Sequence, residues 1–151
     1  MVIYRIAQKK YSGDLKAFGF QGRWNSEGVN VIYASWSRSL ACLENIVHRR
    51  NQLSNENFSL MVIQTSKEVS IDRIDLGQLD SEWSLNTPRA RSICQRVGDK
   101  LVRSNRSCLI QVPSVIVKEE HNYIINTQHP DFPKIQLVGI EHFFFDPRLS
   151  S

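Results

Sequence analysis

The segment at residues 20–48 constrains the fold of this chain most strongly. An Asn-Ser-Glu-Gly turn leads into a short apolar stretch at 29–35, which predicts a strand. A Ser-rich segment follows, in which Ser37 or Ser39 can cap the start of a helix. The apolar side chains that share one arc of this helix are Leu40, Leu43, Ile46 and Val47. The segment therefore predicts a strand followed by an amphipathic helix.

Three side chains of this segment are of types that a ligand site needs. The Arg23 guanidinium can hold a phosphate bidentately, and the Tyr33 ring offers a flat face to a heteroaromatic ring. Glu44 can serve glycosyl chemistry as a base or a charge stabiliser. It lies at the edge of the apolar arc, and His48 follows one helical turn later. The ordinary alternative is that Glu44 only forms an ion pair with His48 or an Arg.

The rest of the chain predicts further strands and a second helix. The strand-like stretches are residues 2–7, 58–64, 69–76, 107–117, 123–126 and 135–145. Thr87 and Pro88 mark a helix start, and apolar spacing predicts an amphipathic helix at 88–103 with a solvated basic face. The expected fold class is therefore α+β, with a mostly antiparallel sheet and flanking helices. With 41% hydrophobic residues and no linker, residues 1–151 are expected to form a single domain.

Two residues of the predicted strands are further candidates. Pro113 interrupts the stretch at 107–117, and because proline cannot donate to a strand ladder, a bulge or an edge position is expected there. Ser114 would then point into a cleft, or would only accommodate the kink. Arg5 lies in the first predicted strand, where it either faces solvent or contacts a ligand.

Charge, cysteines and missing motifs narrow the function classes. The formal net charge of +4 comes from Lys and Arg spread along the chain, which gives a weak preference for anions. The three cysteines lie far apart in apolar stretches, as expected for reduced residues of a cytoplasmic protein. No apolar run approaches the roughly 18 residues of a membrane span. No Rossmann, P-loop or metal-binding motif occurs, so any catalysis is expected to need no metal.

Four segments, in their order and spacing, resemble the RES domain family, which is named for an Arg, a Glu and a Ser. They are YRIA near the N-terminus, GRWNSEGVNVIYAS at 22–35, LACLENIVH at 40–48, and LIQVPSVIVKEEHNYIINTQHPDF followed by FFFDPRL. The resemblance covers essentially the whole chain. It implies a bacterial toxin that consumes NAD⁺ and has a fold similar to ADP-ribosyltransferases of the diphtheria-toxin type. It also implies an Xre-like helix-turn-helix antitoxin as partner.

The resemblance also implies roles for individual residues. The positions that match the family pattern are Arg5, Arg23, Tyr33, Glu44, His48, Ser114 and Asn126. By this resemblance, Arg5 and Arg23 would hold the pyrophosphate of NAD⁺, and Tyr33 would pack on the nicotinamide or its ribose. Glu44 would stabilise the oxocarbenium-like transition state, and Ser114 would hydrogen-bond the nicotinamide-ribose side. His48 and Asn126 would belong to the NAD⁺ site without an assigned step.

The acceptor of the ADP-ribose group stays open at the level of sequence. Water would make the protein an NAD⁺ glycohydrolase, inorganic phosphate a phosphorylase, and a protein side chain a mono-ADP-ribosyltransferase. NAD⁺ degradation ranks first, since no long extra loop suggests a protein target. A non-catalytic basic binding module is a different class, but scattered aromatic residues oppose nucleic-acid binding. By analogy, a homodimer is expected whose NAD⁺ cleft is plugged by the antitoxin's C-terminal segment.

Overall fold

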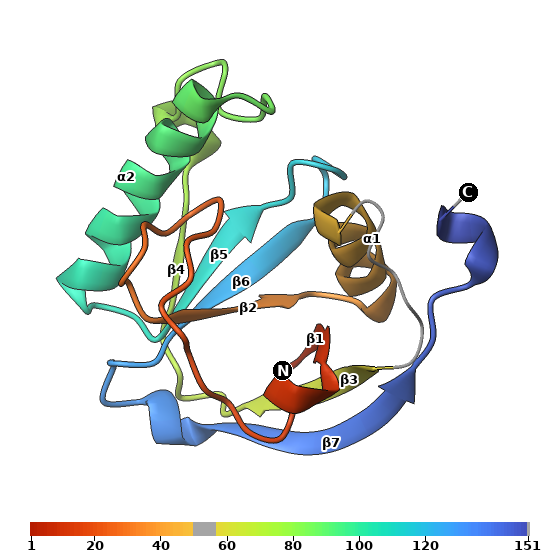
Figure 1. Ribbon diagram of the computed structural model, residues 1–151. Helices are drawn as coiled ribbons and strands as arrows, with labels where there is room; N and C mark the ends of the chain where they lie inside the picture. Colours follow the sequence, from red (N-terminus) through yellow and green to blue (C-terminus); the bar gives the residue numbers. More distant parts are fainter. Residues whose placement is uncertain (50–56, 151) are drawn as a thin grey trace.

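The computed structural model describes residues 1–49 and 57–150 and builds its strands into one sheet (Figure 1). The strands are β1 (Val2–Gln8), β2 (Val31–Ser35), β3 (Phe58–Thr65), β4 (Ile71–Arg73), β5 (Leu109–Pro113), β6 (His121–Asn126) and β7 (Ile135–Phe143). Their order is β4-β5-β6-β2-β1-β3-β7. The β4–β5 pair is parallel, and the other neighbouring pairs are antiparallel. The prediction of a mostly antiparallel sheet is therefore confirmed.

The sheet is weakly joined between β1 and β2. These strands share a single register pair, Tyr4 with Ser35, whereas β1 pairs with β3 along its whole length, from Val2 to Gln8. Figure 1 shows the strands on either side of this junction diverging, with helix α1 (Arg38–Arg49) beside it. Backbone groups of the two strands are therefore left without strand partners at the junction, and side chains can reach them.

Helix α1 begins and packs as its sequence predicts. The Ser37 hydroxyl accepts a hydrogen bond from the Leu40 N–H at 3.1 Å, so of the two expected caps Ser37 is the one used. Ala41 packs into a buried cluster with residues of β1 and β3. The helix is thereby fixed over the half of the sheet that contains β1, with its Glu44 side toward the junction.

Helix α2 (Pro88–Ser104) anchors the long segment between β1 and β2. It starts with the predicted cap, since the Thr87 hydroxyl accepts from the Ala90 N–H at 3.1 Å. At Gly98 an added Cβ would lie 1.8 Å from the Trp24 carbonyl oxygen, so only glycine permits this contact. At the next residue, the buried Asp99 carboxylate accepts from both the backbone N–H and the hydroxyl of Ser26.

Two strand predictions are wrong in extent. The stretch at 69–76 forms only the three-residue edge strand β4. The stretch at 107–117 ends as β5 at Pro113, and residues 114–120 turn back into β6 instead of continuing the strand. The predicted edge position of Pro113 is confirmed, because β4 pairs with β5 only as far as Gln111.

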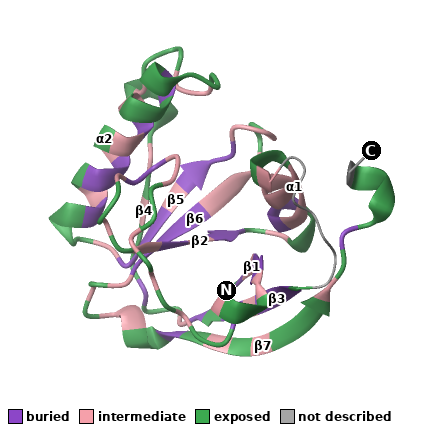
Figure 2. Cartoon of the chain, viewed as in Figure 1, coloured by how far each residue is buried: buried purple, intermediate pink, exposed green. Residues whose placement is uncertain are grey.

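The buried residues lie mainly in the middle of the sheet. Figure 2 shows buried residues concentrated on the central strands, whereas β7 and the outer side of α2 are largely exposed. Neither helix in the described part of the chain combines the length and the apolarity of a membrane span.

Candidate active site

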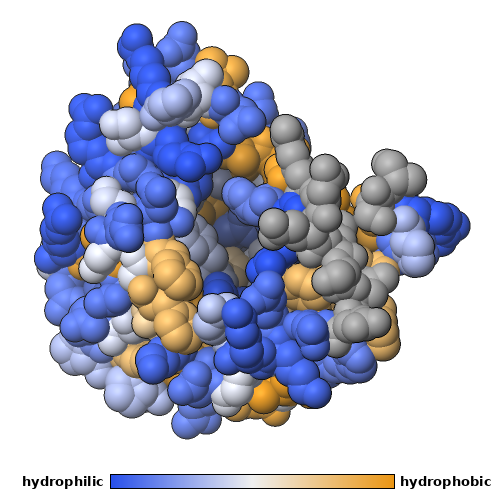
Figure 3. Space-filling view, viewed as in Figure 1, coloured by the Kyte–Doolittle hydropathy of each residue, from blue (hydrophilic) through white to orange (hydrophobic). Residues whose placement is uncertain are grey.

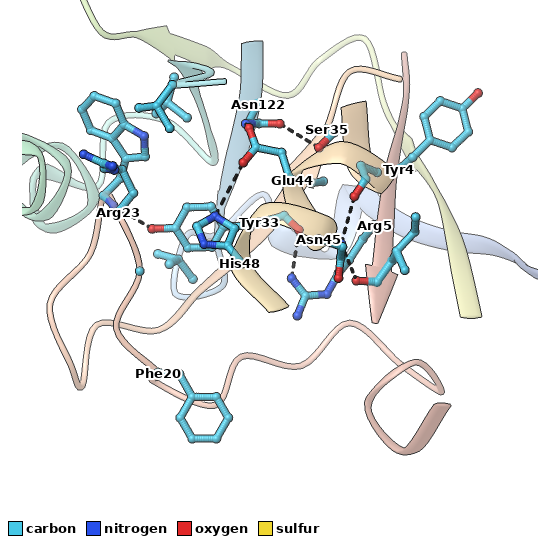
Figure 4. A pocket seen from close by; sticks show the side chains of 18 of the residues that line it. Tyr4, Arg5, Phe20, Arg23, Tyr33, Ser35, Glu44, Asn45, His48 and Asn122 are labelled. Atoms are coloured by element: carbon cyan, nitrogen blue, oxygen red, sulfur yellow. Dashed lines mark hydrogen bonds and ion pairs between the residues drawn. The ribbon is translucent and has the colours of Figure 1, made fainter. Parts of the chain in front are cut away.

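A cavity of about 440 Å³ opens at the junction between β1 and β2. Its walls come from both strands, from α1, from the segment at 16–24 and from the ends of β5 and β6. Figure 3 shows the hollow in the middle of one face of the molecule, and Figure 4 shows it from close by. Its volume lies within the range of about 300–1,000 Å³ that is usual for small-molecule sites.

Glu44 is held on the wall of this cavity as a carboxylate. Its Oε1 accepts hydrogen bonds from the Ser114 hydroxyl at 2.9 Å and from the Asn122 side-chain amide at 2.6 Å. Its Oε2 lies 3.6 Å from Nε2 of His48, whose side chain is mostly exposed. Burial acts to raise the pKa of Glu44, but His48 and the two hydrogen bonds outweigh it and hold the pKa below its ordinary value. Glu44 is therefore ionised at neutral pH.

Ser114 supports Glu44 from behind the cavity wall. It is fully buried, and its hydroxyl oxygen also accepts from the backbone N–H groups of Ile116 and Val117 at 3.1 Å each. Because these two donors occupy the oxygen, the hydroxyl proton points to Glu44. The turn that follows Pro113 is thus what orients Ser114, and Ser114 in turn orients the carboxylate.

Asn122 is the partner of Glu44 that the sequence reasoning missed. It lines the cavity, and its side-chain oxygen accepts from the Ser35 hydroxyl at 2.7 Å, which fixes the amide with its nitrogen toward Glu44. Ser35 and Asn122 are direct neighbours across β2 and β6. Asn126 was expected in the site but does not line the cavity. Its side-chain amide donates instead to the Val102 carbonyl oxygen near the end of α2.

Tyr33 reaches from β2 across the cavity to the loop. Its hydroxyl donates to Oδ1 of the buried Asn25 at 2.6 Å and accepts from the Trp24 N–H at 2.9 Å. Burial raises the pKa of the Tyr33 hydroxyl above its ordinary value, so it stays protonated. A Cβ at Gly22 would lie 2.6 Å from this hydroxyl, so the side chain fits only because residue 22 is glycine. Tyr33 therefore presents a fixed ring edge and face to the cavity.

Arg5 crosses the junction between the two halves of the sheet. Its Nη1 donates to the Tyr33 carbonyl oxygen at 2.9 Å, a backbone group that lacks a strand partner there. Burial and the nearby positive charge of Arg49 lower the pKa of Arg5. Arg49 also lines the cavity, where its Nε donates to the Asn45 side chain at 3.1 Å. Two guanidinium groups thus repel one another at a site where an anion would relieve the repulsion.

Arg23 lines the cavity from the segment at 16–24, away from Arg5 (Figure 4). Its Nη1 donates to the carbonyl oxygens of Trp83 and Leu85, at 3.1 Å each. Among the described residues, the ion pairs include none with Arg5, Arg23 or Arg49, and Glu44 is the one carboxylate of the lining. The cavity is therefore cationic, with a single fixed negative charge.

The structure brings together most of the residues that the sequence singled out. The cavity is lined by Arg5, Arg23, Tyr33, Glu44 and His48, and Ser114 touches it through Glu44. Within residues 1–49 and 57–150, no cluster of three His, Cys, Asp or Glu side chains is arranged to hold a metal ion. A cationic pocket with one oriented carboxylate can bind a phosphorylated ligand and stabilise a positive charge that develops on it.

The chain is similar to known proteins over most of its length. A model of the RES domain matches residues 2–146. The Prs ADP-ribosylating toxin of Sphingobium sp. (strain YBL2) is 38% identical over 130 residues, 85% of this chain and 80% of that protein. Toxin Res of Photorhabdus laumondii is 35% identical over 156 positions, covering 99% of this chain and 97% of the relative.

A solved structure shares the fold. One chain of the M. tuberculosis MbcT–MbcA toxin–antitoxin complex superposes with a TM-score of 0.76 at 18% identity, over 99% of this chain and 86% of the other. At this identity the match speaks for the fold alone. The expected α+β architecture, with a mostly antiparallel sheet and flanking helices, is confirmed.

Proposed function

Because the chain belongs to the RES domain family, we propose that it is the toxin of a toxin–antitoxin pair and cleaves the nicotinamide–ribose bond of NAD⁺. The observation that carries the proposal is the ionised Glu44 carboxylate, held by Ser114 and Asn122 inside an otherwise cationic cavity. NAD⁺ has both features that such a cavity selects, an anionic pyrophosphate and a ribose that gains positive charge as its bond to nicotinamide breaks.

The proposed reaction starts with cleavage of the C1–N bond of the nicotinamide ribose. The bonding electron pair goes to the pyridinium nitrogen, so nicotinamide leaves as a neutral molecule and the ribose becomes an oxocarbenium-like cation. Glu44 stabilises this cation, since its negative charge interacts more strongly with the transition state than with the ground state. Water then adds to C1 and releases its proton to solvent, which gives ADP-ribose. With inorganic phosphate as acceptor the product is ADP-ribose-1″-phosphate.

The remaining residues bind and orient the substrate in this proposal. Arg5, with Arg49 beside it, faces the pyrophosphate, because an anion relieves their mutual repulsion. Arg23 adds a third positive charge from the loop, and Tyr33 packs on the nicotinamide or its ribose. Ser114 and Asn122 are positioning residues, since their hydrogen bonds go to Glu44.

A second candidate is transfer of the ADP-ribose group to a protein side chain. It is favoured by one observation, the 38% identity to a protein named for ADP-ribosylation of Prs. Both reactions share the donor site and the cleavage step, and differ in which nucleophile approaches C1. Cleavage of the nicotinamide–ribose bond, with Glu44 stabilising the ribose cation, is therefore common to both candidates.

The partner and the compartment are part of the same proposal. The solved relative comes from a toxin–antitoxin complex, and we infer an Xre-like antitoxin that plugs the cavity of a homodimeric toxin. The three cysteines are free thiols, which supports a reducing compartment such as the cytoplasm.

The proposal is tested by incubating purified protein with NAD⁺, with and without phosphate, and identifying the products by chromatography and mass. Nicotinamide with free ADP-ribose indicates hydrolysis, and ADP-ribose-1″-phosphate indicates phosphorolysis. Adding cell extract reveals labelled protein if a side chain is the acceptor. If folded protein releases no nicotinamide in any of these arms, the proposed function is wrong.

A further inference from the structure

Two aromatic side chains form an exposed ledge at the cavity, apart from the residues around Glu44. Phe18 and Phe20 both line the cavity, yet 42% and 68% of their surfaces stay exposed. Their rings stack nearly parallel, with centroids 6.0 Å apart and an interplanar angle of 17°. Tyr11 supports Phe18 from behind, edge to face, at 4.9 Å. Figure 4 shows the Phe20 ring on its loop, separated from the cluster around Glu44.

The backbone beneath this ledge is held in place. Gly19, between the two rings, has φ +71°, a left-handed conformation that favours glycine, and its carbonyl accepts from the Gly28 N–H at 2.8 Å. The Phe20 carbonyl accepts from the side chain of the buried Asn25 at 2.9 Å. Asn25 is also the residue that accepts from the Tyr33 hydroxyl. Asn25 thus links the backbone of the ledge to Tyr33 in the cavity wall, although the Phe20 ring is exposed to solvent.

The charges beside the ledge indicate what it binds. Lys16 lines the cavity, and its ammonium lies 5.5 Å from the centre of the Phe18 ring. Arg23 follows Phe20 by three residues and lines the same cavity. A flat apolar surface next to positive charges matches a planar base attached to a phosphate, because every base has a face that can stack on an aromatic ring.

We propose that Phe20, supported by Phe18, is the stacking platform for the adenine ring of an adenine nucleotide. The inference rests on the proposed function for the identity of the whole ligand, since in NAD⁺ the adenine lies at the end remote from the nicotinamide. With the nicotinamide ribose at Glu44 and Tyr33 and the pyrophosphate at the arginines, we place the adenine end at the ledge, which lines the same cavity. The exposed Phe20 ring then contributes affinity for the adenine half of the dinucleotide.

Calorimetric binding of AMP and of nicotinamide mononucleotide, which carry the two halves of NAD⁺ separately, tests this assignment. The variants are Phe20→Ala, Phe20→Trp, which keeps a stacking surface, and Phe144→Ala. Phe144 is 64% exposed and does not line the cavity, so it is matched in exposure. Thermal unfolding of each variant establishes that it is folded.

We expect Phe20→Ala to weaken AMP binding about tenfold, within the range for loss of one base-stacking contact, and to leave nicotinamide mononucleotide binding unchanged. Phe20→Trp retains AMP binding, and Phe144→Ala affects neither ligand. The proposal is overturned if AMP binds Phe20→Ala as tightly as wild type, if both ligands weaken equally, or if wild type binds no AMP. Release of nicotinamide from NAD⁺ by the same wild-type sample reports on the proposed function separately, so the two failures are distinguishable.

Discussion

Exchange of Asn122 for Asp changes the charge beside Glu44 and little else. The substitution keeps the shape of the side chain and the acceptor of the Ser35 hydroxyl. It replaces the amide nitrogen that donates to Glu44 at 2.6 Å by a carboxylate oxygen. Two carboxylates then share one position, and they can do so stably only with a proton between them.

The distance sets the size of the effect. Two unit charges 2.6 Å apart repel by about 2 kcal/mol in water and by about 6 kcal/mol at an effective dielectric constant of about 20. Each roughly 1.4 kcal/mol raises the apparent pKa of the pair by one unit. The acid limb of activity should therefore move toward neutral pH by at least about one pH unit. The loss of the hydrogen bond acts in the same direction.

The assay is the pH dependence of kcat/KM for nicotinamide release, measured on wild type, Asn122→Asp and Asn122→Ala. The alanine variant removes the donor without adding charge, so its acid limb should move less than that of Asn122→Asp. If the profile of Asn122→Asp overlays that of wild type, then either Glu44 does not act as an anion or Asn122 does not position it.

Three further predictions concern the support of the site. Ser114→Ala removes the hydrogen-bond partner of two backbone N–H groups and of Glu44. It should lower the free energy of unfolding, measured in urea, by about 2 kcal/mol. An unchanged urea midpoint would contradict this. Gly22→Ala places a Cβ 2.6 Å from the Tyr33 hydroxyl. It should lower the free energy of unfolding by about 1–3 kcal/mol and raise the KM for NAD⁺. A wild-type unfolding free energy together with a wild-type KM would refute the close packing. Since the folded-state pKa of Glu44 lies below 4.5, its ionised form stabilises the fold above that pH, and the contribution is lost as pH falls further. Glu44→Gln should thus be less stable than wild type at pH 7, with a difference that shrinks below pH 4.5 rather than staying constant.

Local signals in the sequence predicted the elements that carry the site. The i, i+4 spacing of Glu44 and His48 placed both on one face of α1, where they lie 3.6 Å apart. Thr87 marked the start of α2 through its capping hydroxyl. Pro113 marked the break in β5, although the chain turns there instead of continuing past a bulge. These features depend on residues that are close in sequence, so they can be predicted from the sequence alone.

The features that were missed depend on which strands become neighbours. Asn122 and Asn126 lie at opposite ends of β6, and nothing in HNYIIN tells which end meets Glu44. That follows only from the pairing of β6 with β2, which puts Asn122 beside Ser35. Likewise, the cavity opens where β1 and β2 share only a single register pair, and Arg5 donates there to the Tyr33 carbonyl oxygen. Pairing of strands remote in sequence is a property of the assembled sheet.

The most direct measurement compares Glu44→Gln with wild type for both NAD⁺ turnover and NAD⁺ affinity. If Glu44 stabilises the transition state, kcat for nicotinamide release falls by at least about 100-fold, while the Kd for NAD⁺ changes only a few-fold. The exposed Glu119, in the turn before β6, provides the matched control, and Glu119→Gln should keep wild-type turnover. If Glu44→Gln cleaves NAD⁺ at the wild-type rate, Glu44 does not have this role.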